Sequence, residues 1–307
     1  MRDLTIIGGS AAAITAGIYA ARRGLNFVVV AKEFGGEVAT SGEVGNWPGM
    51  PKTDGFTLAK QFKEHLDSYG APTEDGVWVE AIVKEADGTF TVKGKRGDEV
   101  LSFQSRAVIV ATGVHPRELG VPGEKEYRNK GVSYCTTCDG PIFAGKVTAT
   151  VGGGNSALES ALMLSDIASH VYVVNKNAAF KGDAMLMENL AKKKNVTVLY
   201  SALTTKIDGE QFVQKLVYTD GSGAEQSFAV DGVFVHIGNI PNSSIVPQEV
   251  VKDDIGQIVV DAYCATNVPG LFAAGDVTNV PFNQIVIATG QGCIAALAAV
   301  QYLNRQS

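Results

Sequence analysis

The chain has 307 residues, a length that suggests about two domains, each large enough for its own hydrophobic core. With 45% hydrophobic and 19% charged residues it has the composition of a soluble globular protein, and its net charge of −6 disfavours a nucleic acid or an anionic membrane as partner. A structural zinc site would need Cys264 and Cys293, which stand alone without a partner at ligand spacing, so no metal site is predicted.

Two apolar segments near the ends of the chain could be mistaken for targeting or membrane segments. Residues 11–21 are small and apolar, but two arginines follow this run, and Asp3 stands where a signal peptide would be basic. Residues 284–303 contain three glutamines and two glycines, which predicts a buried helix with its lead-in loop and no membrane span. We therefore expect a cytoplasmic protein.

The first section of the chain predicts a strand, a glycine-rich turn with a helix, and a second strand, at residues 4–7, 8–21 and 27–31. In this setting the turn exposes backbone amides at a helix N-terminus, where a pyrophosphate can bind. The match to the dinucleotide-binding pattern is imperfect, because Ser10 and Ala13 replace its second and third glycines and the nearest carboxylate is Glu33. A nucleotide site and a simple packing turn both remain open.

The next section should run from a loop through a helix to an antiparallel sheet. Residues 35–49 predict a long loop without regular structure, of the kind that is usually functional or mobile. Residues 57–69 predict an amphipathic helix, and residues 77–110 predict strands that end in a buried strand. The turn at 111–113 then leads to residues 114–116, a candidate crossing point between domains.

Cys135 and Cys138 stand three residues apart, with Asp139 directly after the second cysteine. A pair at this spacing can close a reversible disulfide whose poise depends on local charge. Half of a zinc site or a pair of ordinary core cysteines would give the same spacing. The position of the pair between two nucleotide-binding patterns favours the redox interpretation.

The pattern of the N-terminus returns after these cysteines, with a strand at 147–151, a glycine-rich turn and helix at 152–164 and a strand at 171–174. Gly152, Gly154 and Ala157 occupy the three diagnostic places, so the chain contains an internal repeat that predicts two bound dinucleotides.

The end of the second strand of this repeat should indicate which nucleotide is used. It carries Asn175, Lys176 and later Lys181, and so has neither an acid for a free ribose nor an arginine for a 2′-phosphate. The two lysines weakly favour a nucleotide with a 2′-phosphate, although a solvated basic turn explains them equally well.

The last part of the chain predicts a further alternating sheet region, a second crossing point, a strand and a helix, at residues 196–235, 238–242, 270–274 and 292–302. Gly275 and Asp276 at the end of this last strand can hold a ribityl hydroxyl and add amides near a phosphate. The predicted fold is α/β, with two Rossmann-like three-layer domains, the second inserted into the first. The outer domain comprises residues 1–114 and 242–307, and the inner domain comprises residues 115–241.

Together these motifs resemble the low-molecular-weight thioredoxin reductases and the C-terminal portion of alkyl hydroperoxide reductase flavoproteins, both of class II of the pyridine nucleotide-disulfide oxidoreductases. The motifs that carry the resemblance lie at residues 111–113, 135–140, 152–157, 238–242 and 273–277. Residues 281–288 look more like the hydroperoxide reductase branch. The additional N-terminal thioredoxin-like domain of that branch is not expected within these 307 residues.

The resemblance implies FAD in the outer domain, NADPH or NADH in the inner domain, and hydride transfer through the flavin to a disulfide of Cys135 and Cys138. It implies that Cys138 meets the flavin, that Cys135 attacks the disulfide of thioredoxin or a thioredoxin-like protein, and that Asp139 manages the thiol proton. It also implies a homodimer. The FAD residues would be Gly8, Gly9, Ser10, Ala11, Ala12, Glu33, Gly36, Glu37, Val38, Asn46, Ala111, Thr112, Gly113, Gly275, Asp276, Asn283, Gln284 and Ile285. The NAD(P) residues would be Gly152, Gly154, Asn155, Ser156, Ala157, Glu159, Asn175, Lys176, Lys181 and Gly238.

The chain departs from the family pattern at the nicotinamide site, where His-Arg-Arg is replaced by residues 175–177, and at Glu37, where the family has Gln. The first hypothesis is a flavin-dependent thioredoxin-disulfide reductase that uses NAD(P)H. The second keeps this chemistry but takes electrons from a donor such as ferredoxin, or serves a peroxiredoxin directly. The third is a flavin-bearing redox sensor without turnover.

Overall fold

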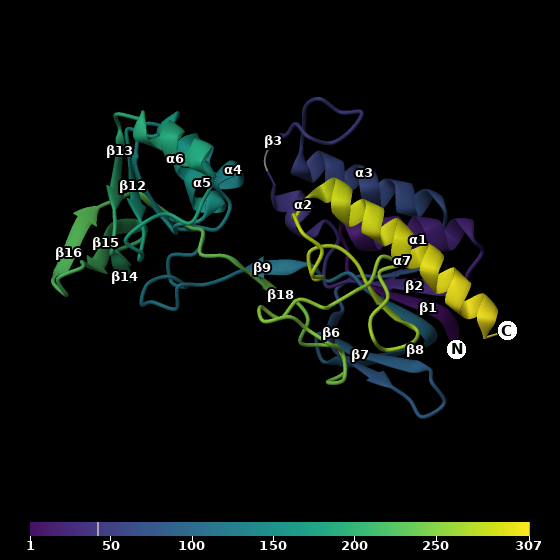
Figure 1. Ribbon diagram of the computed structural model, residues 1–307. Coiled ribbons are helices and arrows are strands. Elements are labelled where there is room, and N and C mark those ends of the chain that lie inside the picture. Colours follow the sequence, from purple (N-terminus) through teal and green to yellow (C-terminus); the bar gives the residue numbers. More distant parts are fainter. Residues whose placement is uncertain (42, 307) are drawn as a thin grey trace. The chain divides into compact units, whose positions relative to one another are not determined.

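The computed structural model describes residues 1–41 and 43–306, apart from the side chains of Glu43 and Cys138. The chain divides into two compact units (Figure 1). Unit 1 comprises Met1–His115 and Ile240–Ser307, and unit 2 comprises Pro116–Asn239. These divisions lie one and two residues from the domain boundaries expected from the sequence.

A mixed sheet forms the centre of unit 1. Its order is β5-β2-β1-β8-β7-β6, and β19 also pairs with β8. The parallel strands are β1 (Arg2–Ile7), β2 (Phe27–Val30), β5 (Thr73–Glu74), β8 (Glu99–Val110) and β19 (Leu271–Ala273). The antiparallel strands β6 (Trp78–Lys84) and β7 (Phe90–Arg96) extend the sheet from β8. All four residues of β2 are buried, as expected for a parallel strand covered on both faces.

Three helices, α1 (Ala11–Arg22), α3 (Gly55–Ser68) and α7 (Ile285–Arg305), run alongside one another over this sheet (Figure 1). The backbones of α1 and α7 meet closely, because a Cβ on Gly292 would lie 2.2 Å from the carbonyl oxygen of Ala12. The Asp54 carboxylate caps α3 by accepting a hydrogen bond from the Thr57 amide at 2.8 Å. By length and composition α7 alone among the described helices could cross a membrane, and here its alanine-rich face packs in the core against α1.

Two expectations for unit 1 were wrong. Residues 35–49 are not without regular structure, since they contain the short helix α2 (Gly36–Thr40) and the strand β3 (Glu43–Val44), which pairs with β4 (Thr53–Asp54). These elements are too short to show a periodic pattern, and buried Val38 anchors α2 by tertiary packing. The last helix begins at Ile285 instead of residue 292, because contact with Ala12 outweighs the low helix propensity of its two glycines.

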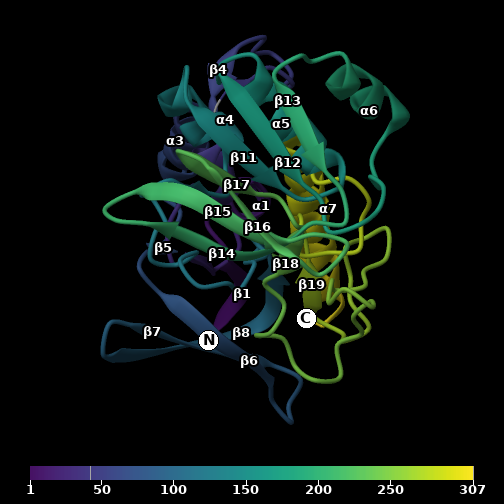
Figure 2. The ribbon, with the colours of Figure 1, turned by 90° about the vertical axis from the view of Figure 1, so that its left-hand side faces the viewer.

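Unit 2 is built on a parallel sheet of order β10-β17-β11-β12-β13, of which Figure 2 labels β11, β12, β13 and β17. The strands are β10 (Val132–Ser133), β11 (Val147–Val151), β12 (His170–Val174), β13 (Val196–Leu199) and β17 (Gly232–Val235). Its helices are α4 (Thr136–Asp139), the 3-10 turn at Gly140–Phe143, α5 (Asn155–Ser165) and α6 (Ala184–Ala191). The helix α6 was not predicted.

The region 196–235 is not one alternating sheet, as the sequence suggested. Its first and last strands, β13 and β17, join the parallel sheet, and the middle part forms a separate three-stranded sheet. That sheet consists of β14 (Leu203–Gly209), β15 (Val213–Thr219) and β16 (Glu225–Ala229). Alternation along the chain reports which side chains are buried but not which strand is the neighbour, so it could not separate the two sheets.

The chain passes between the units along two short strands, β9 (Val114–Pro116) and β18 (Asn239–Pro241), which pair with each other. Both lie at the crossing points that the sequence suggested.

Candidate functional site

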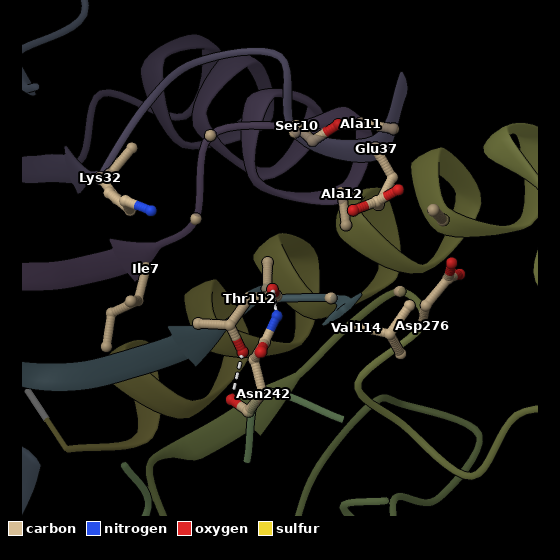
Figure 3. Close-up of a pocket in the computed structure, with 18 of the residues that line it drawn as sticks. Ile7, Ser10, Ala11, Ala12, Lys32, Glu37, Thr112, Val114, Asn242 and Asp276 are labelled. Carbon is tan, nitrogen blue, oxygen red and sulfur yellow. Dashed lines mark hydrogen bonds between the residues drawn. The ribbon is translucent and has the colours of Figure 1, made fainter. Parts of the chain in front are cut away.

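A cavity of about 660 Å³ in unit 1 lies at the carboxyl ends of β1, β2, β8 and β19 (Figure 3). This is the edge at which open parallel sheets bind ligands, because the turns that follow the strands converge there. Among the residues predicted to bind a flavin, Asn46 alone is outside the lining. The others line the cavity, namely Gly8, Gly9, Ser10, Ala11, Ala12, Glu33, Gly36, Glu37, Val38, Ala111, Thr112, Gly113, Gly275, Asp276, Asn283, Gln284 and Ile285. Asn46 donates a hydrogen bond of 3.0 Å from its side-chain amide to Gln284.

The glycine-rich turn at the start of α1 forms one wall of this cavity. Gly8 has a φ of +132°, and a Cβ there would lie 2.2 Å from the carbonyl oxygen of Ala111. A Cβ on Gly9 would lie 2.2 Å from the carbonyl oxygen of Glu33. Ser10, which replaces the second glycine of the motif, has a structural role, because its hydroxyl donates a 2.6 Å hydrogen bond to the Gly35 carbonyl. Ser10 thereby ties the turn to the segment that precedes α2.

Two carboxyl groups of the cavity have altered acidity. Burial, and secondarily the negative charge of Glu37, raise the pKa of Asp276 to about 6. Burial also raises the pKa of Glu37, whereas the hydrogen bond from Thr40 and the charge of His115 act in the opposite direction. Figure 3 shows Glu37 and Asp276 among the residues that line this cavity. Near pH 6 the Asp276 carboxyl can therefore change between accepting a hydrogen bond from a ligand hydroxyl and donating one to it.

Reciprocal hydrogen bonds close the floor of the cavity where the chain leaves and re-enters unit 1. The Thr112 hydroxyl donates to the Asn242 carbonyl, and the Asn242 amide donates to the Thr112 carbonyl, each at 2.8 Å (Figure 3). His115 Nδ1 donates to Asn242 Oδ1 at 2.6 Å. His115, Asn242, Lys32 and Trp78 all line the cavity, although none of them was predicted to belong to the site. Lys32 comes two residues after the end of β2 and stands next to Glu33, a position that could have identified it.

The cysteine motif begins at the edge of the parallel sheet of unit 2. Cys135 is disulfide-bonded and directly precedes α4; the side chain of Cys138, its predicted partner, lies outside the described part of the structure. The Ser133 hydroxyl accepts a hydrogen bond from the Cys135 amide at 3.0 Å and donates one to the Cys135 carbonyl at 3.2 Å. Asp139 ends α4, and its amide donates to the Cys135 carbonyl at 3.1 Å.

The second glycine-rich turn lies in the same unit, between β11 and α5. Gly152 has a φ of +150°, and a Cβ there would lie 2.1 Å from the carbonyl oxygen of His236. The loop after β12 lies across this turn, because the Lys181 amide donates to the Gly153 carbonyl at 2.7 Å. The Asp183 amide and carboxylate both bond to the side chain of Asn155, at 2.8 and 3.1 Å.

The residues predicted to choose the nucleotide have separate roles in this loop. Asn175 is fully buried; its side chain donates to the Ala179 carbonyl and accepts from the Asn177 amide, each at 3.0 Å. Asn175 therefore shapes the loop, whereas Lys176 and Lys181 are exposed. The other predicted residues lie on the turn, on α5 or before β18, with Asn155, Ser156, Glu159 and Gly238 exposed, Gly152 and Ala157 buried, and Gly154 half-buried.

Comparison with known proteins gives consistent matches over almost the whole chain. A family model described as pyridine nucleotide-disulphide oxidoreductase matches residues 2–292. A component of alkyl hydroperoxide reductase in Xanthomonas campestris pv. phaseoli is 40% identical over 308 residues, covering 99% of this chain and 58% of that protein. A protein named NADH dehydrogenase from Bacillus subtilis is 40% identical over 304 residues, covering 99% of this chain and 59% of that protein. The chain thus spans less than two thirds of the length of these relatives.

Solved structures also match over almost the whole chain. Thioredoxin reductase of Lactococcus lactis superposes with a TM-score of 0.85 at 30% identity, covering 99% of this chain and 100% of that one. The family resemblance and the fold class predicted from the motifs are confirmed.

Proposed function

Because the chain belongs to the pyridine nucleotide-disulphide oxidoreductase family, we propose that it is a flavin-dependent disulfide reductase. Electrons would pass from NADPH or NADH through FAD and the disulfide of Cys135 and Cys138 to thioredoxin or a thioredoxin-like protein. In the net reaction, NAD(P)H, a proton and the partner disulfide yield NAD(P)⁺ and the partner dithiol. The observation that carries this proposal is that disulfide-bonded Cys135 lies in unit 2, which also contains the glycine-rich turn at Gly152. The other glycine-rich turn, at Gly8, opens on the cavity of unit 1.

The residues of the unit 1 cavity suit FAD. A Cβ at Gly8 or Gly9 would strike a backbone carbonyl, so only glycine lets this turn pack so closely, and a pyrophosphate would bind the backbone amides at the N-terminus of α1. Asp276 and Glu37 would bind hydroxyl groups of the cofactor, and the reciprocal bonds of Thr112 and Asn242 fix the floor of the cavity. When bound, the flavin would supply the two-electron chemistry that links a nicotinamide to a disulfide.

The protein residues of unit 2 would manage the sulfur chemistry. By the family resemblance, Cys135 attacks the partner disulfide and Cys138 faces the flavin. The Ser133 hydroxyl holds the Cys135 backbone through two hydrogen bonds, which fixes the position of the attacking sulfur. Asp139, one residue after the second cysteine, would transfer the proton that a thiol gives up when it becomes a nucleophile.

A second candidate keeps the same chemistry but reduces a peroxiredoxin directly. The 40% identity to a component of alkyl hydroperoxide reductase supports it. Turnover assays with a thioredoxin disulfide and with an oxidised peroxiredoxin, at matched concentrations, would separate the two candidates through the ratio of their kcat/KM values.

The experiment that tests the proposal is an anaerobic titration of the purified flavoprotein with NADPH and, separately, with NADH, followed by the flavin absorbance. Bleaching by either nucleotide at low concentration supports a hydride-donor site in unit 2. If neither nucleotide bleaches a flavin that dithionite reduces, the nicotinamide donor is wrong, and reduced ferredoxin becomes the donor to test.

The choice between the two nucleotides can be tested at the exposed lysines. If Lys176 and Lys181 bind a 2′-phosphate, replacing both with Ala should raise the KM for NADPH by about tenfold or more, as expected for charge-assisted hydrogen bonds. The KM for NADH should change little. Equal changes for both nucleotides would mean that the lysines form only a solvated turn.

A further inference from the structure

Thr136, the first residue between the two cysteines, has a buried side chain that takes part in a chain of hydrogen bonds. Its hydroxyl lies 2.6 Å from the Ser160 hydroxyl on α5 and 2.8 Å from Nε2 of His236, which directly follows β17. The Ser160 hydroxyl lies 3.1 Å from the Thr150 hydroxyl on β11. Thr136, Ser160 and Thr150 are 5%, 4% and 0% exposed, so water does not compete for these bonds.

The direction of the hydrogen bonds follows from a count of protons. Burial lowers the pKa of His236 to about 4, so the imidazole is neutral at physiological pH and carries one N–H. If that proton is on Nδ1, then Thr150 donates to Ser160, Ser160 donates to Thr136, and Thr136 donates to Nε2 of His236. Every hydroxyl proton then has an acceptor. With the proton on Nε2, all three hydrogen bonds reverse direction, and the Thr150 hydroxyl proton has no acceptor within the cluster. The first arrangement is therefore favoured.

This cluster joins the cysteine motif to the second glycine-rich turn. The carbonyl oxygen of His236 is the atom that excludes a side chain from Gly152, while its imidazole holds Thr136. Meanwhile α4 has only four residues, which is too short to be stable by itself. Its geometry therefore depends on the disulfide of Cys135 and on side-chain contacts to the rest of unit 2.

We propose that Thr136, Ser160, Thr150 and His236 are positioning residues that hold the cysteine motif in its disulfide geometry and thereby set its thiol–disulfide equilibrium. The cluster is present with Cys135 in a disulfide. If it persists in the dithiol, it keeps the two sulfurs preorganised to close; if it loosens in the dithiol, it stabilises the disulfide alone. Both cases have the same consequence, namely that loss of the cluster shifts the equilibrium toward the dithiol.

The test uses the flavoprotein in anaerobic mixtures of reduced and oxidised dithiothreitol. Reduction of the protein disulfide consumes two electrons and two protons from dithiothreitol, which closes to its cyclic disulfide. After acid quenching and alkylation, mass spectrometry of the tryptic peptide of residues 131–146 measures the fraction in the dithiol form.

Thr136→Val removes the hydroxyl at nearly constant shape, and we expect the equilibrium to move about three- to tenfold toward the dithiol, as for loss of one or two buried hydrogen bonds. Ser160→Ala breaks only part of the cluster and should give a smaller shift in the same direction. Thr136→Ser keeps the hydroxyl and should restore the equilibrium of the unchanged protein.

A matched control exists in the same unit. Thr197 on β13 bonds to Nε2 of His170 at 3.0 Å, at the edge of the sheet opposite β10 and the cysteine motif. Thr197→Val removes a similar pair, and the equilibrium should stay unchanged. A folded, flavin-loaded Thr136→Val with an unchanged equilibrium would overturn the proposal, as would an equal shift in Thr197→Val. If Thr136→Val fails to fold, Ser160→Ala decides.

This inference rests on the proposed function, because it assigns the disulfide a redox role. The measurement needs neither a nicotinamide nor a protein partner, however. A flavoprotein that no nucleotide reduces would contradict the proposed donor and leave the dithiothreitol equilibrium measurable, so the two failures are distinguishable.

Discussion

The two glycine-rich turns of this chain share a motif but differ in what surrounds them. In unit 1 the turn at Gly8 opens on a cavity of about 660 Å³. In unit 2 the turn at Gly152 is crossed by the loop after β12, through bonds from Lys181 to Gly153 and from Asp183 to Asn155. A repeat at the level of sequence therefore predicts the local backbone at both places, but not whether a ligand has access to it.

The difference also extends to titratable groups. The cavity of unit 1 holds acids whose charged forms are disfavoured by burial, whereas the corresponding region of unit 2 holds the neutral imidazole of His236. The first arrangement can respond to a ligand rich in hydroxyls, and the second fixes a neighbouring redox motif.

The largest effect on activity should come from removal of the Cys135 sulfur. Cys135→Ser should lower disulfide reduction by at least ~10³-fold while flavin remains bound, because the attacking nucleophile is lost and the flavin cavity lies in the other unit. Steady-state assays and the flavin spectrum of the same sample measure both. Cys264→Ser is the control, since Cys264 is free and buried in the core of unit 1. Residual activity above a few percent in Cys135→Ser would contradict its assignment.

The next largest effect, on ligand binding, should come from adding a side chain to either glycine-rich turn. Gly8→Ala should abolish flavin retention, because its Cβ would lie 2.2 Å from the Ala111 carbonyl at a φ of +132°. Gly152→Ala should instead spare flavin binding and weaken nucleotide binding, because the clash with His236 lies in unit 2. Gly154→Ala, where no atom lies within 4 Å of the added Cβ, is the matched control and should fold normally. Flavin content after purification and calorimetry with NADPH distinguish these outcomes.

The two units should respond oppositely to pH between about 4 and 6. The pKa of Asp276 is raised from 3.8 to about 6, so protonation favours folded unit 1, and this contribution is lost as pH rises through 6. The pKa of His236 is lowered from 6.5 to about 4, so its contribution is present above 6.5 and is lost as pH falls toward 4. Each shift corresponds to about 3 kcal/mol.

Hydrogen exchange of the flavin-free protein, resolved by peptide, measures these opposite slopes. Asp276→Asn should flatten the slope of unit 1 only, and His236→Gln should flatten the slope of unit 2 only. Slopes of equal sign in both units, unaffected by these variants, would show that other groups dominate the pH dependence.

The smallest effect concerns Glu37, whose charge helps to raise the pKa of Asp276. Glu37→Gln should move the pH midpoint of flavin affinity slightly downward, by less than about one pH unit, since burial is the larger cause of the shift. A fluorescence titration of flavin binding at several pH values measures the midpoint. An upward movement would mean that Glu37 does not act through its charge on Asp276.

Much of this structure was predictable because buried parallel strands and glycine-rich turns leave strong local patterns. The strands at 4–7 and 147–151 and both crossing segments follow such patterns. The short helix α2 and the helix α6 were missed or misjudged because one or two turns carry too little periodicity. Within the site, motif residues came together around the cavity, whereas His115 and Asn242 were missed because their bond joins residues distant in sequence.

The cluster around Thr136 could not be predicted for the same reason. Thr136, Ser160 and His236 are ordinary residues in separate motifs, and only the packing of α4 against α5 and β17 brings them into contact.

The paired crossing strands β9 and β18 have a consequence for how the chain folds. Unit 1 is interrupted between His115 and Ile240, and closing an unfolded loop of that length costs on the order of 4 kcal/mol in chain entropy. Unit 2 is continuous, and once folded it holds its own ends together, with the Arg117 amide bonded to the Gly238 carbonyl at 2.8 Å. Prior folding of unit 2 would therefore remove most of the entropic cost of assembling unit 1. The inserted unit would bring together the two segments of the unit that surrounds it in sequence.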